Sequence, residues 1–189
     1  GKASVIAGTG SNSTATTISS TREAEKIGVD AAMIVVPYYN KPSQDGLYAH
    51  YSAVADATSL PLIIYNIPGR TGINMSPDTV GKLSEVKNII GIKEAAGDLG
   101  QVSLIKKAVP DTFYIWSGDD NLTLPIMAVG GHGVISVASH IVGREMKEMI
   151  NAFVSGEVNK AIKLHLKLMP VFKNIFITSN PVPIKACLR

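Results

Sequence analysis

The chain has 189 residues, of which 46% are hydrophobic and 17% are charged. This composition is typical of a folded globular protein, and it excludes a disordered or fibrous chain. The formal net charge of +3 comes from 18 basic and 15 acidic residues scattered along the sequence, without a basic stripe interleaved with aromatic residues, so we expect no nucleic-acid partner.

The single cysteine and the lengths of the apolar runs bear on the cellular location of the protein. A single cysteine, Cys187, cannot form an internal disulfide, and no residues show paired metal-ligand spacing. We therefore expect a cytoplasmic location, no metal and no other cofactor. No stretch reaches the roughly 18 apolar residues that a membrane span needs, and the first residues lack the pattern of a signal peptide, so we expect no membrane partner.

Short apolar runs alternate with segments of helical periodicity along the chain. Runs rich in Val and Ile predict strands at 4–8, 31–37, 62–66, 89–93, 113–117 and 133–136. Helical spacing predicts helices at 15–27, 46–57, 77–83, 102–109, 122–129, 144–154 and 157–177. Because the strands are continuous apolar runs, they are typical of parallel strands covered by helices.

The predicted strands end at regular intervals. Thr9, Pro37, Tyr65 and Lys93 each stand at the C-terminal end of a strand, and successive members are 28 residues apart. An interval of this length suits a βα unit, which needs about 30 residues. Doubly wound sheets and (β/α)8 barrels are both built from such units.

The turn after the first strand argues against a doubly wound nucleotide-binding sheet. Residues 8–13 lack the third glycine of the G-x-G-x-x-G pattern, and no acidic residue follows at the expected strand end. We interpret Gly8 and Gly10 as residues of a tight turn, with one of residues 12–14 capping the next helix. A nucleotide-binding domain stays an alternative that detectable NAD binding would support.

Unusual residues gather at the predicted C-terminal strand ends, where a (β/α)8 barrel carries its active site. They are Tyr38, Tyr39, Tyr65, Asn66, Lys93, Glu94, residues 117–120, His132 and Ser136. A complete barrel has about 250 residues. We therefore expect an α/β protein with a partial (β/α)8 TIM barrel of about six βα units, without the first two units and a C-terminal helical tail. Residues 1–143 would form the partial barrel, and residues 144–189 its last helix and the start of a C-terminal helical region.

Lys93 ends the apolar run 89–92, and this position allows two interpretations. Burial among isoleucines would lower the pKa of Lys93, so that a neutral amine could form a Schiff base with a ketone and support aldolase chemistry. Alternatively, Lys93 forms an ion pair with Glu94, Asp98 or Asp119 at the barrel rim. Charge placement alone does not separate the two interpretations.

The preceding strand favours catalysis. Tyr65 stands in register with Lys93 on a neighbouring parallel strand, roughly 4.8 Å away, where a phenol can relay protons. Arg70 follows in a Pro-Gly turn and could bind a carboxylate with two hydrogen bonds. Each has an ordinary alternative, which is packing for Tyr65 and a surface position for Arg70.

Five segments in series resemble the dihydrodipicolinate synthase family of class I aldolases, to which N-acetylneuraminate lyases also belong. They are PYYNKP at 37–42, YNIPGRTG at 65–72, GIKE at 91–94, SGDD at 117–120 and GGHGVIS at 130–136. The resemblance covers essentially the whole chain, as strands three to eight of the family's barrel. It implies a Schiff-base condensation of pyruvate with aspartate semialdehyde to 4-hydroxy-tetrahydrodipicolinate, in the diaminopimelate route to lysine.

The resemblance also implies roles for individual residues. Lys93 matches the imine-forming lysine and Tyr65 the proton-relay tyrosine. Tyr39 matches a catalytic tyrosine that reaches into a neighbouring subunit, which implies a homo-oligomer, either a dimer or a tetramer. Arg70 matches the arginine that binds the carboxylate of the aldehyde, which lyase relatives generally lack. Two further residues fall where the family lines its substrate pocket: Gly118 and Ile135.

The sequence departs from the family's pattern in two places. A Gly-Thr-Thr-Gly-Glu motif that helps to hold pyruvate is absent, and Thr16-Thr17 lies inside a predicted helix. We therefore expect the chain alone to be inactive and to expose unpaired strand edges. Asn12 and Tyr38 resemble residues that contact inhibitory lysine in some members, but those members have a glutamate where this chain has Thr16. We expect weak or absent inhibition by lysine.

Two other functions stay open. A related pyruvate-dependent aldolase or lyase, of the N-acetylneuraminate lyase or 2-keto-3-deoxygluconate aldolase type, would share Lys93 and Tyr65. A noncatalytic barrel homologue would use the fold only for binding, although it would not need an apolar-flanked lysine at a strand end.

Overall fold

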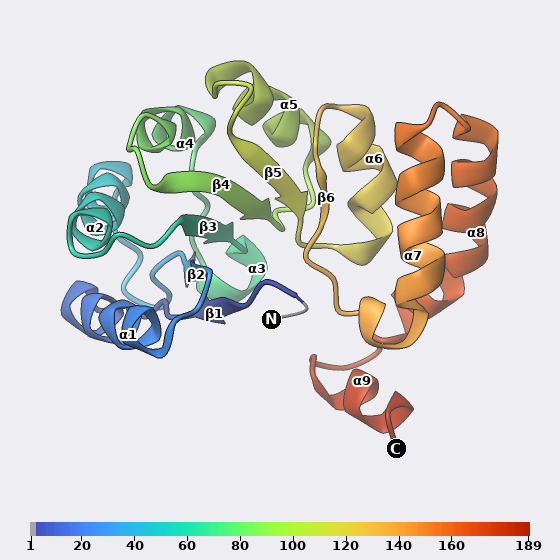
Figure 1. Ribbon diagram of the computed structural model, residues 1–189, viewed down its shortest axis with the longest axis horizontal. Coiled ribbons are helices and arrows are strands. Elements are labelled where there is room, and N and C mark those ends of the chain that lie inside the picture. Colours follow the sequence, from blue (N-terminus) through green and yellow to red (C-terminus); the bar gives the residue numbers. More distant parts are fainter. Residues whose placement is uncertain (1–2) are drawn as a thin grey trace.

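The computed structural model describes residues 3–189 and contains one parallel sheet. Its six strands pair in the order of the sequence: β1 (Ile6–Gly8), β2 (Ala31–Val35), β3 (Leu62–Asn66), β4 (Ile89–Glu94), β5 (Tyr114–Ser117) and β6 (Gly133–Val134). In Figure 1 the strands form an arc, and helices line its outer side. This arrangement confirms the predicted partial (β/α)8 barrel. Within residues 3–189, β1 and β6 are the two edges of the sheet and do not pair with each other.

Helices connect and follow the strands. They are α1 (Thr14–Ile27), α2 (Gln44–Asp56), α3 (Pro68–Thr71), α4 (Pro77–Ser84), α5 (Leu99–Ala108), the 3-10 helix η1 (Asp120–Leu122), α6 (Thr123–Ala128), α7 (Ser139–Val154), α8 (Val158–Asn174) and α9 (Val182–Cys187). No helix in the described part of the chain is long and apolar enough to cross a membrane. The division of the chain at residue 143 stays a prediction.

Two helices begin three or more residues before the start that their apolar periodicity predicts. Helix α5 begins at Leu99 because the Asp98 side chain accepts hydrogen bonds from the backbone N–H groups of Gly100 (2.8 Å) and Gln101 (3.1 Å). Helix α7 begins at Ser139 instead of residue 144, and non-helical dihedral angles at Val142 divide it into two parts. The kink interrupts the periodicity from which the start was predicted.

The first βα turn differs from the sequence interpretation. Ser13 caps α1, as one of the predicted candidates, and accepts a hydrogen bond from the Thr16 N–H at 3.3 Å. The tight-turn interpretation is wrong, because Gly8 is the last residue of β1 and neither Gly8 nor Gly10 has a positive φ. Gly10 instead allows a close approach to β2, since a Cβ atom there would lie 2.4 Å from the Val35 backbone nitrogen.

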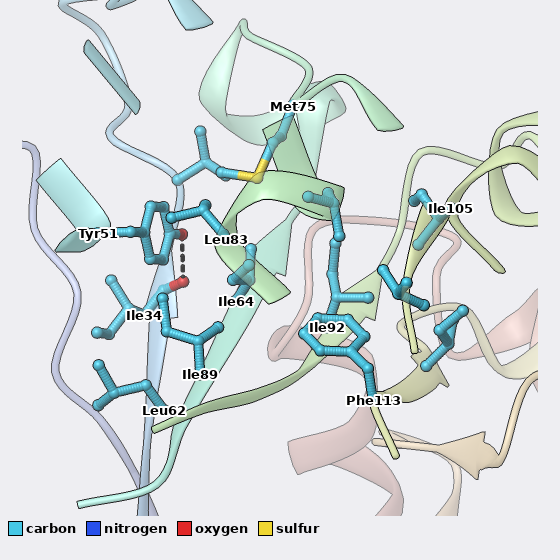
Figure 2. Packing of buried hydrophobic residues seen from close by; sticks show 14 of the residues in the cluster. Ile34, Tyr51, Leu62, Ile64, Met75, Leu83, Ile89, Ile92, Ile105 and Phe113 are labelled. Carbon is cyan, nitrogen blue, oxygen red and sulfur yellow. Dashed lines mark hydrogen bonds between the residues drawn. The ribbon is translucent and has the colours of Figure 1, made fainter. Parts of the chain in front are cut away.

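The core lies between the outer face of the sheet and the helices (Figure 2). Side chains that alternate along the strands share this face and are almost fully buried: Ala32, Ile34, Leu62, Ile64, Ile92 and Ile115. Tyr51 on α2 joins them, and its hydroxyl donates to the Ile34 carbonyl at 2.8 Å. The sheet's outer face is thus fixed against the helices.

The opposite, concave face carries the residues that alternate with the core. Register pairs join Tyr65 with Lys93, Lys93 with Trp116, and Gly91 with Tyr114. Gly91 has no room for a side chain, because a Cβ atom would lie 2.5 Å from the Tyr114 carbonyl oxygen and 2.7 Å from the Trp116 ring. The aromatic residues of β5 therefore pack directly against the backbone beneath Lys93.

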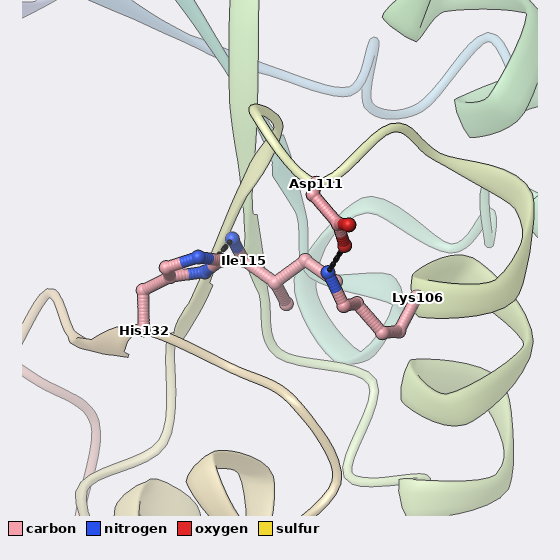
Figure 3. A network of polar contacts seen from close by, with 4 residues as sticks. All are labelled: Lys106, Asp111, Ile115 and His132. Atoms are coloured by element: carbon pink, nitrogen blue, oxygen red, sulfur yellow. Dashed lines mark hydrogen bonds and ion pairs between the residues drawn. The ribbon is translucent and has the colours of Figure 1, made fainter. Parts of the chain in front are cut away.

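Polar contacts fix the ends of β5 and β6 (Figure 3). The His132 Nδ1 atom accepts from the Ile115 N–H at 3.1 Å, and the His132 N–H donates to the Ile115 carbonyl at 2.7 Å. Lys106, on α5, forms an ion pair of 2.8 Å with Asp111 before β5. Because the Asp111 side chain is 98% exposed, this ion pair adds little stability. The histidine contacts add to the strand pairing of Trp116 with Gly133 and Ser117 with Val134, which attaches β6 to the sheet.

Alanine substitutions at two glycines of the strands test this packing. We expect Gly91→Ala to destabilise the fold by about 1–3 kcal/mol, because the added methyl group meets backbone that cannot move freely. Gly8→Ala is the matched control, since a Cβ atom at Gly8 meets nothing within 4 Å. Urea unfolding followed by circular dichroism measures both variants, and equal stability of the two would contradict the packing described for Gly91.

Candidate active site

Lys93 and Tyr65 form the centre of the candidate site at the C-terminal ends of β4 and β3. They are a register pair, as the sequence predicts. The Lys93 Nζ atom lies over the Tyr65 ring, 4.1 Å from its centroid, and the lysine residue is only 8% exposed. The amine and the phenol ring are therefore in direct contact on the concave face of the sheet.

Burial lowers the pKa of Lys93, because it removes water from the charged form. The nearby carboxylates of Asp120 and Asp119 oppose this shift, and the Arg70 guanidinium reinforces it. The net direction is downward, which increases the fraction of neutral, nucleophilic amine at a given pH.

The ion-pair interpretation of Lys93 is not supported by its neighbours. Glu94 accepts hydrogen bonds from other residues on the opposite face of β4, and Asp98 caps α5. Within residues 3–189, no carboxylate oxygen forms a salt bridge with the Lys93 amine. Asp119 acts on Lys93 through its charge and not as a paired ion.

The Tyr65 hydroxyl is suited to donate a proton. Burial raises the pKa of Tyr65, the Arg70 guanidinium opposes this shift, and the Asp119 carboxylate adds to it. The hydroxyl therefore stays protonated at neutral pH and can act as a hydrogen-bond donor.

Arg70 lies at the mouth of the site. It is on the one-turn helix α3, where the sequence predicts a turn, and its side chain is exposed. Its guanidinium affects the pKa of both Tyr65 and Lys93, while Nη2 donates to the Asn180 carbonyl at 3.5 Å. The guanidinium can thus meet an anion that enters from solvent.

The structure brings Gly118 to Lys93. A Cβ atom at Gly118 would lie 2.6 Å from the Ala95 Cβ and 3.2 Å from the Lys93 Cε, so a side chain does not fit. The Gly118 N–H donates to the Glu94 carbonyl at 2.7 Å. Ile135 follows β6, is half-buried, and donates its N–H to the Ser117 carbonyl at 3.0 Å. Gly118 allows the chain after β5 to pack against the lysine stem.

Tyr39 stands apart from the Lys93 and Tyr65 pair. It is 88% exposed, and its φ of 73° lies in the left-handed region, which is uncommon for residues other than glycine. Its N–H is 3.4 Å from the Thr71 carbonyl, which holds this segment close to α3. The strained backbone presents the ring to solvent.

Asp120 is a site residue that sequence reasoning did not separate from its neighbours. It is 1% exposed and accepts hydrogen bonds from the Ala138 N–H (3.0 Å), the Val137 N–H (3.3 Å) and the Ser136 hydroxyl. Asp120 therefore attaches the segment before α7 to the end of β5, with its charge close to Lys93. The SGDD segment marks the region, but only the fold shows which aspartate is buried.

A cavity of about 390 Å³ shares Asp119 with the surroundings of Lys93, but neither Lys93 nor Tyr65 lines it. Its lining contains Asp119 and Asn121 after β5, together with residues of α8 and the segment after it: Met169, Phe172, Lys173 and Phe176. This volume is within the usual range for small-molecule sites. Within residues 3–189, no group of three or more His, Cys, Asp or Glu residues could hold a metal ion.

The model of the dihydrodipicolinate synthetase family matches residues 1–189. The chain belongs to this family.

Individual members of the dihydrodipicolinate synthetase family are similar over the whole chain. It is 58% identical over 188 residues to 4-hydroxy-tetrahydrodipicolinate synthase of Desulforudis audaxviator, covering 100% of this chain and 64% of that protein. The crystal structure of dihydrodipicolinate synthase from Aquifex aeolicus is 47% identical to this chain in sequence, with a TM-score of 0.97. The match covers 100% of this chain and 65% of that one. The chain thus spans slightly less than two thirds of these relatives.

One of the solved family structures contains pyruvate. The chloride-inhibited dihydrodipicolinate synthase of Acinetobacter baumannii, complexed with pyruvate, is 42% identical to this chain, with a TM-score of 0.95. The match covers 99% of this chain and 64% of that one.

The environment of Lys93 predicts its titration. We expect the amine to become reactive at a lower pH than a free lysine side chain, because burial disfavours the charged form. Labelling with acetic anhydride over a pH series, with a small-molecule lysine analogue in the same sample and detection by mass spectrometry, gives the midpoint. A midpoint equal to that of the analogue would contradict a buried amine.

Proposed function

We propose that the protein condenses pyruvate with aspartate semialdehyde through a Schiff base on Lys93, giving 4-hydroxy-tetrahydrodipicolinate on the route to lysine. The observation that carries this proposal is the buried Lys93 amine, 4.1 Å from the centroid of the Tyr65 ring, in a member of the dihydrodipicolinate synthetase family. The proposed setting is the cytoplasm.

The first half of the reaction needs a neutral amine and a proton donor. The Lys93 amine attacks the keto carbon of pyruvate, and loss of water leaves an imine. The Tyr65 hydroxyl donates a proton to the departing oxygen, and its raised pKa keeps the hydroxyl protonated before this step. The protonated imine withdraws electrons, so the pyruvate methyl group loses a proton and becomes an enamine.

The second half joins the two substrates. The enamine carbon attacks the aldehyde carbon of aspartate semialdehyde, and the aldehyde oxygen takes up a proton as the carbon–carbon bond forms. The amino group that came with aspartate semialdehyde then attacks the imine carbon, which closes the ring and releases the Lys93 amine. Arg70, at the mouth, binds the carboxylate of this substrate with charge-assisted hydrogen bonds. The small volume left by Gly118 and the apolar surface of Ile135 line the space around the imine.

The position of Tyr39 supports a homo-oligomer, either a dimer or a tetramer. Its side chain is 88% exposed, so it is accessible to the site of another subunit. The left-handed backbone at this position holds the ring outward. We assign Tyr39 to the proton relay of a neighbouring copy.

We further propose weak or absent inhibition by lysine. Thr16 lies in the first turn of α1, and its N–H is capped by Ser13. The carbonyl of Asn12 accepts from Asn40 at 2.9 Å, and Tyr38 is 42% exposed. This surface offers an amide and a phenol near position 16 but no carboxylate there to bind an ammonium group.

A related pyruvate-dependent lyase acting on sugar-derived aldehydes is the second candidate. It would use the same Lys93 and Tyr65. The presence of Arg70 at the mouth favours an aldehyde that carries a carboxylate, which is why the condensation with aspartate semialdehyde is the first proposal.

Reduction with borohydride tests the covalent step. We expect pyruvate followed by borohydride to leave a stable adduct on Lys93 in the intact protein, located by peptide mass spectrometry. Lys93→Arg should give no adduct at this position, because arginine does not form the imine. Tyr65→Phe should slow condensation by about 10²–10⁴-fold through loss of proton transfer. Absence of an adduct in the unaltered full-length protein would refute the proposed function, whereas the 189-residue chain alone is expected to be inactive.

Arg70→Ala tests the choice of aldehyde. We expect kcat/KM for aspartate semialdehyde to fall roughly tenfold to a hundredfold, as for loss of hydrogen bonds to a charged group. Trapping of pyruvate should change little, because Arg70 is placed for the second substrate. Unchanged use of aspartate semialdehyde, or turnover only with a sugar-derived aldehyde, would move the assignment to the lyase type.

A further inference from the structure

A buried polar cluster lies behind the catalytic strands, on their helix-facing side. Glu94 is 1% exposed and Asn66 is 0% exposed. The Asn66 Nδ2 atom donates to both carboxylate oxygens of Glu94, at 3.0 and 3.1 Å. The Ala96 N–H and the Gln101 Nε2 atom donate to the same carboxylate at 2.7 and 3.2 Å. Glu94 is thus surrounded by N–H donors only.

The cluster joins four parts of the chain. Asn74, before α4, accepts from Asn66 at 2.7 Å and exchanges hydrogen bonds of 2.7 and 3.1 Å with Gln101 on α5. The Asn66 Oδ1 atom accepts from the Met75 N–H at 3.1 Å. The ends of β3 and β4 are therefore connected to α5 through the buried Asn66, Glu94 and Gln101. The exposed Asn74 extends the connection to the start of α4.

The cluster and the catalytic pair are back to back. Asn66 and Glu94 are a register pair that follows directly after the Tyr65 and Lys93 pair. Because successive side chains of a strand point to opposite faces, one pair faces the helices while the other faces the concave side. A shift of one strand end relative to the other would displace both pairs together.

We propose that Glu94 and Asn66 are positioning residues for the reaction proposed above, on which this inference rests: their hydrogen bonds fix the ends of β3 and β4 so that the Lys93 amine, in its nearly buried position, meets the Tyr65 ring. Neither residue touches a substrate. Their action is through the strand ends alone.

The direction of a pKa change separates this role from a direct effect of charge. Loss of a carboxylate acting directly on Lys93 would lower the lysine pKa, because a negative charge favours the ammonium form. Loosened strand ends would admit water and raise the lysine pKa toward its ordinary value. Four titratable or charged groups face Lys93 from neighbouring elements: Tyr65 on β3, Arg70 on α3, and Asp119 and Asp120 after β5.

The experiment compares pH profiles of pyruvate trapping by borohydride in the intact protein. Glu94→Gln places an amide group against the N–H donors of Asn66, Ala96 and Gln101. We expect the midpoint of the profile to move upward and trapping at neutral pH to slow roughly tenfold or more, as for a small misplacement of reacting groups. An unchanged or lowered midpoint would overturn the inference while the unaltered protein still traps pyruvate. No adduct in the unaltered protein would refute the proposed function, and the inference with it.

Two further variants make the result specific. Tyr51→Phe removes another buried hydrogen bond on the helix-facing side, 2.8 Å long to Ile34, and should lower stability without moving the midpoint. An equal shift in Tyr51→Phe would indicate general loosening and overturn the inference. Gln101→Leu removes a single hydrogen-bond donor to Glu94. If Glu94→Gln does not fold, the trapping midpoint of Gln101→Leu tests the proposal instead. It should give a smaller upward shift, and no shift would count against the proposal.

Discussion

The parallel register of β3 with β4 is the constraint on which the candidate site depends. It places Tyr65 beside Lys93 on the concave face and, one residue later, Asn66 beside Glu94 on the helix-facing side. Alternation of side chains along a strand makes these two pairs inseparable. The chemistry on one face and the hydrogen-bonded cluster on the other are consequences of the same alignment.

The electrostatic balance at Lys93 depends on the chain after β5 as well. Burial and the Arg70 guanidinium lower the pKa of the lysine, whereas Asp120 and Asp119 raise it. Asp120 has a fixed position because backbone N–H groups before α7 bind its carboxylate. Segments that are distant in sequence but adjacent in the sheet therefore determine the pKa of Lys93 together.

Much of this arrangement could be predicted from the sequence. Apolar runs predicted all six strands of the described sheet, and the positions of Tyr65 and Lys93 at the C-terminal ends of neighbouring strands predicted their register. The helix-facing cluster could not be predicted, because the sequence places Asn66 and Glu94 at strand ends but does not show that they bond to each other and to Gln101 on α5. Gly10 was misinterpreted for the same reason: the demand for a glycine there comes from β2 and not from a local turn.

The order of the strands has a consequence for how the site forms during synthesis. Every strand pairs with the one that precedes it in the sequence, from β1 to β6. Loop closure between successive strands is therefore a series of steps of similar and modest length. The contact between the phenol ring and the amine belongs to a single such step, so two consecutive βα units emerging from the ribosome contain both of its partners.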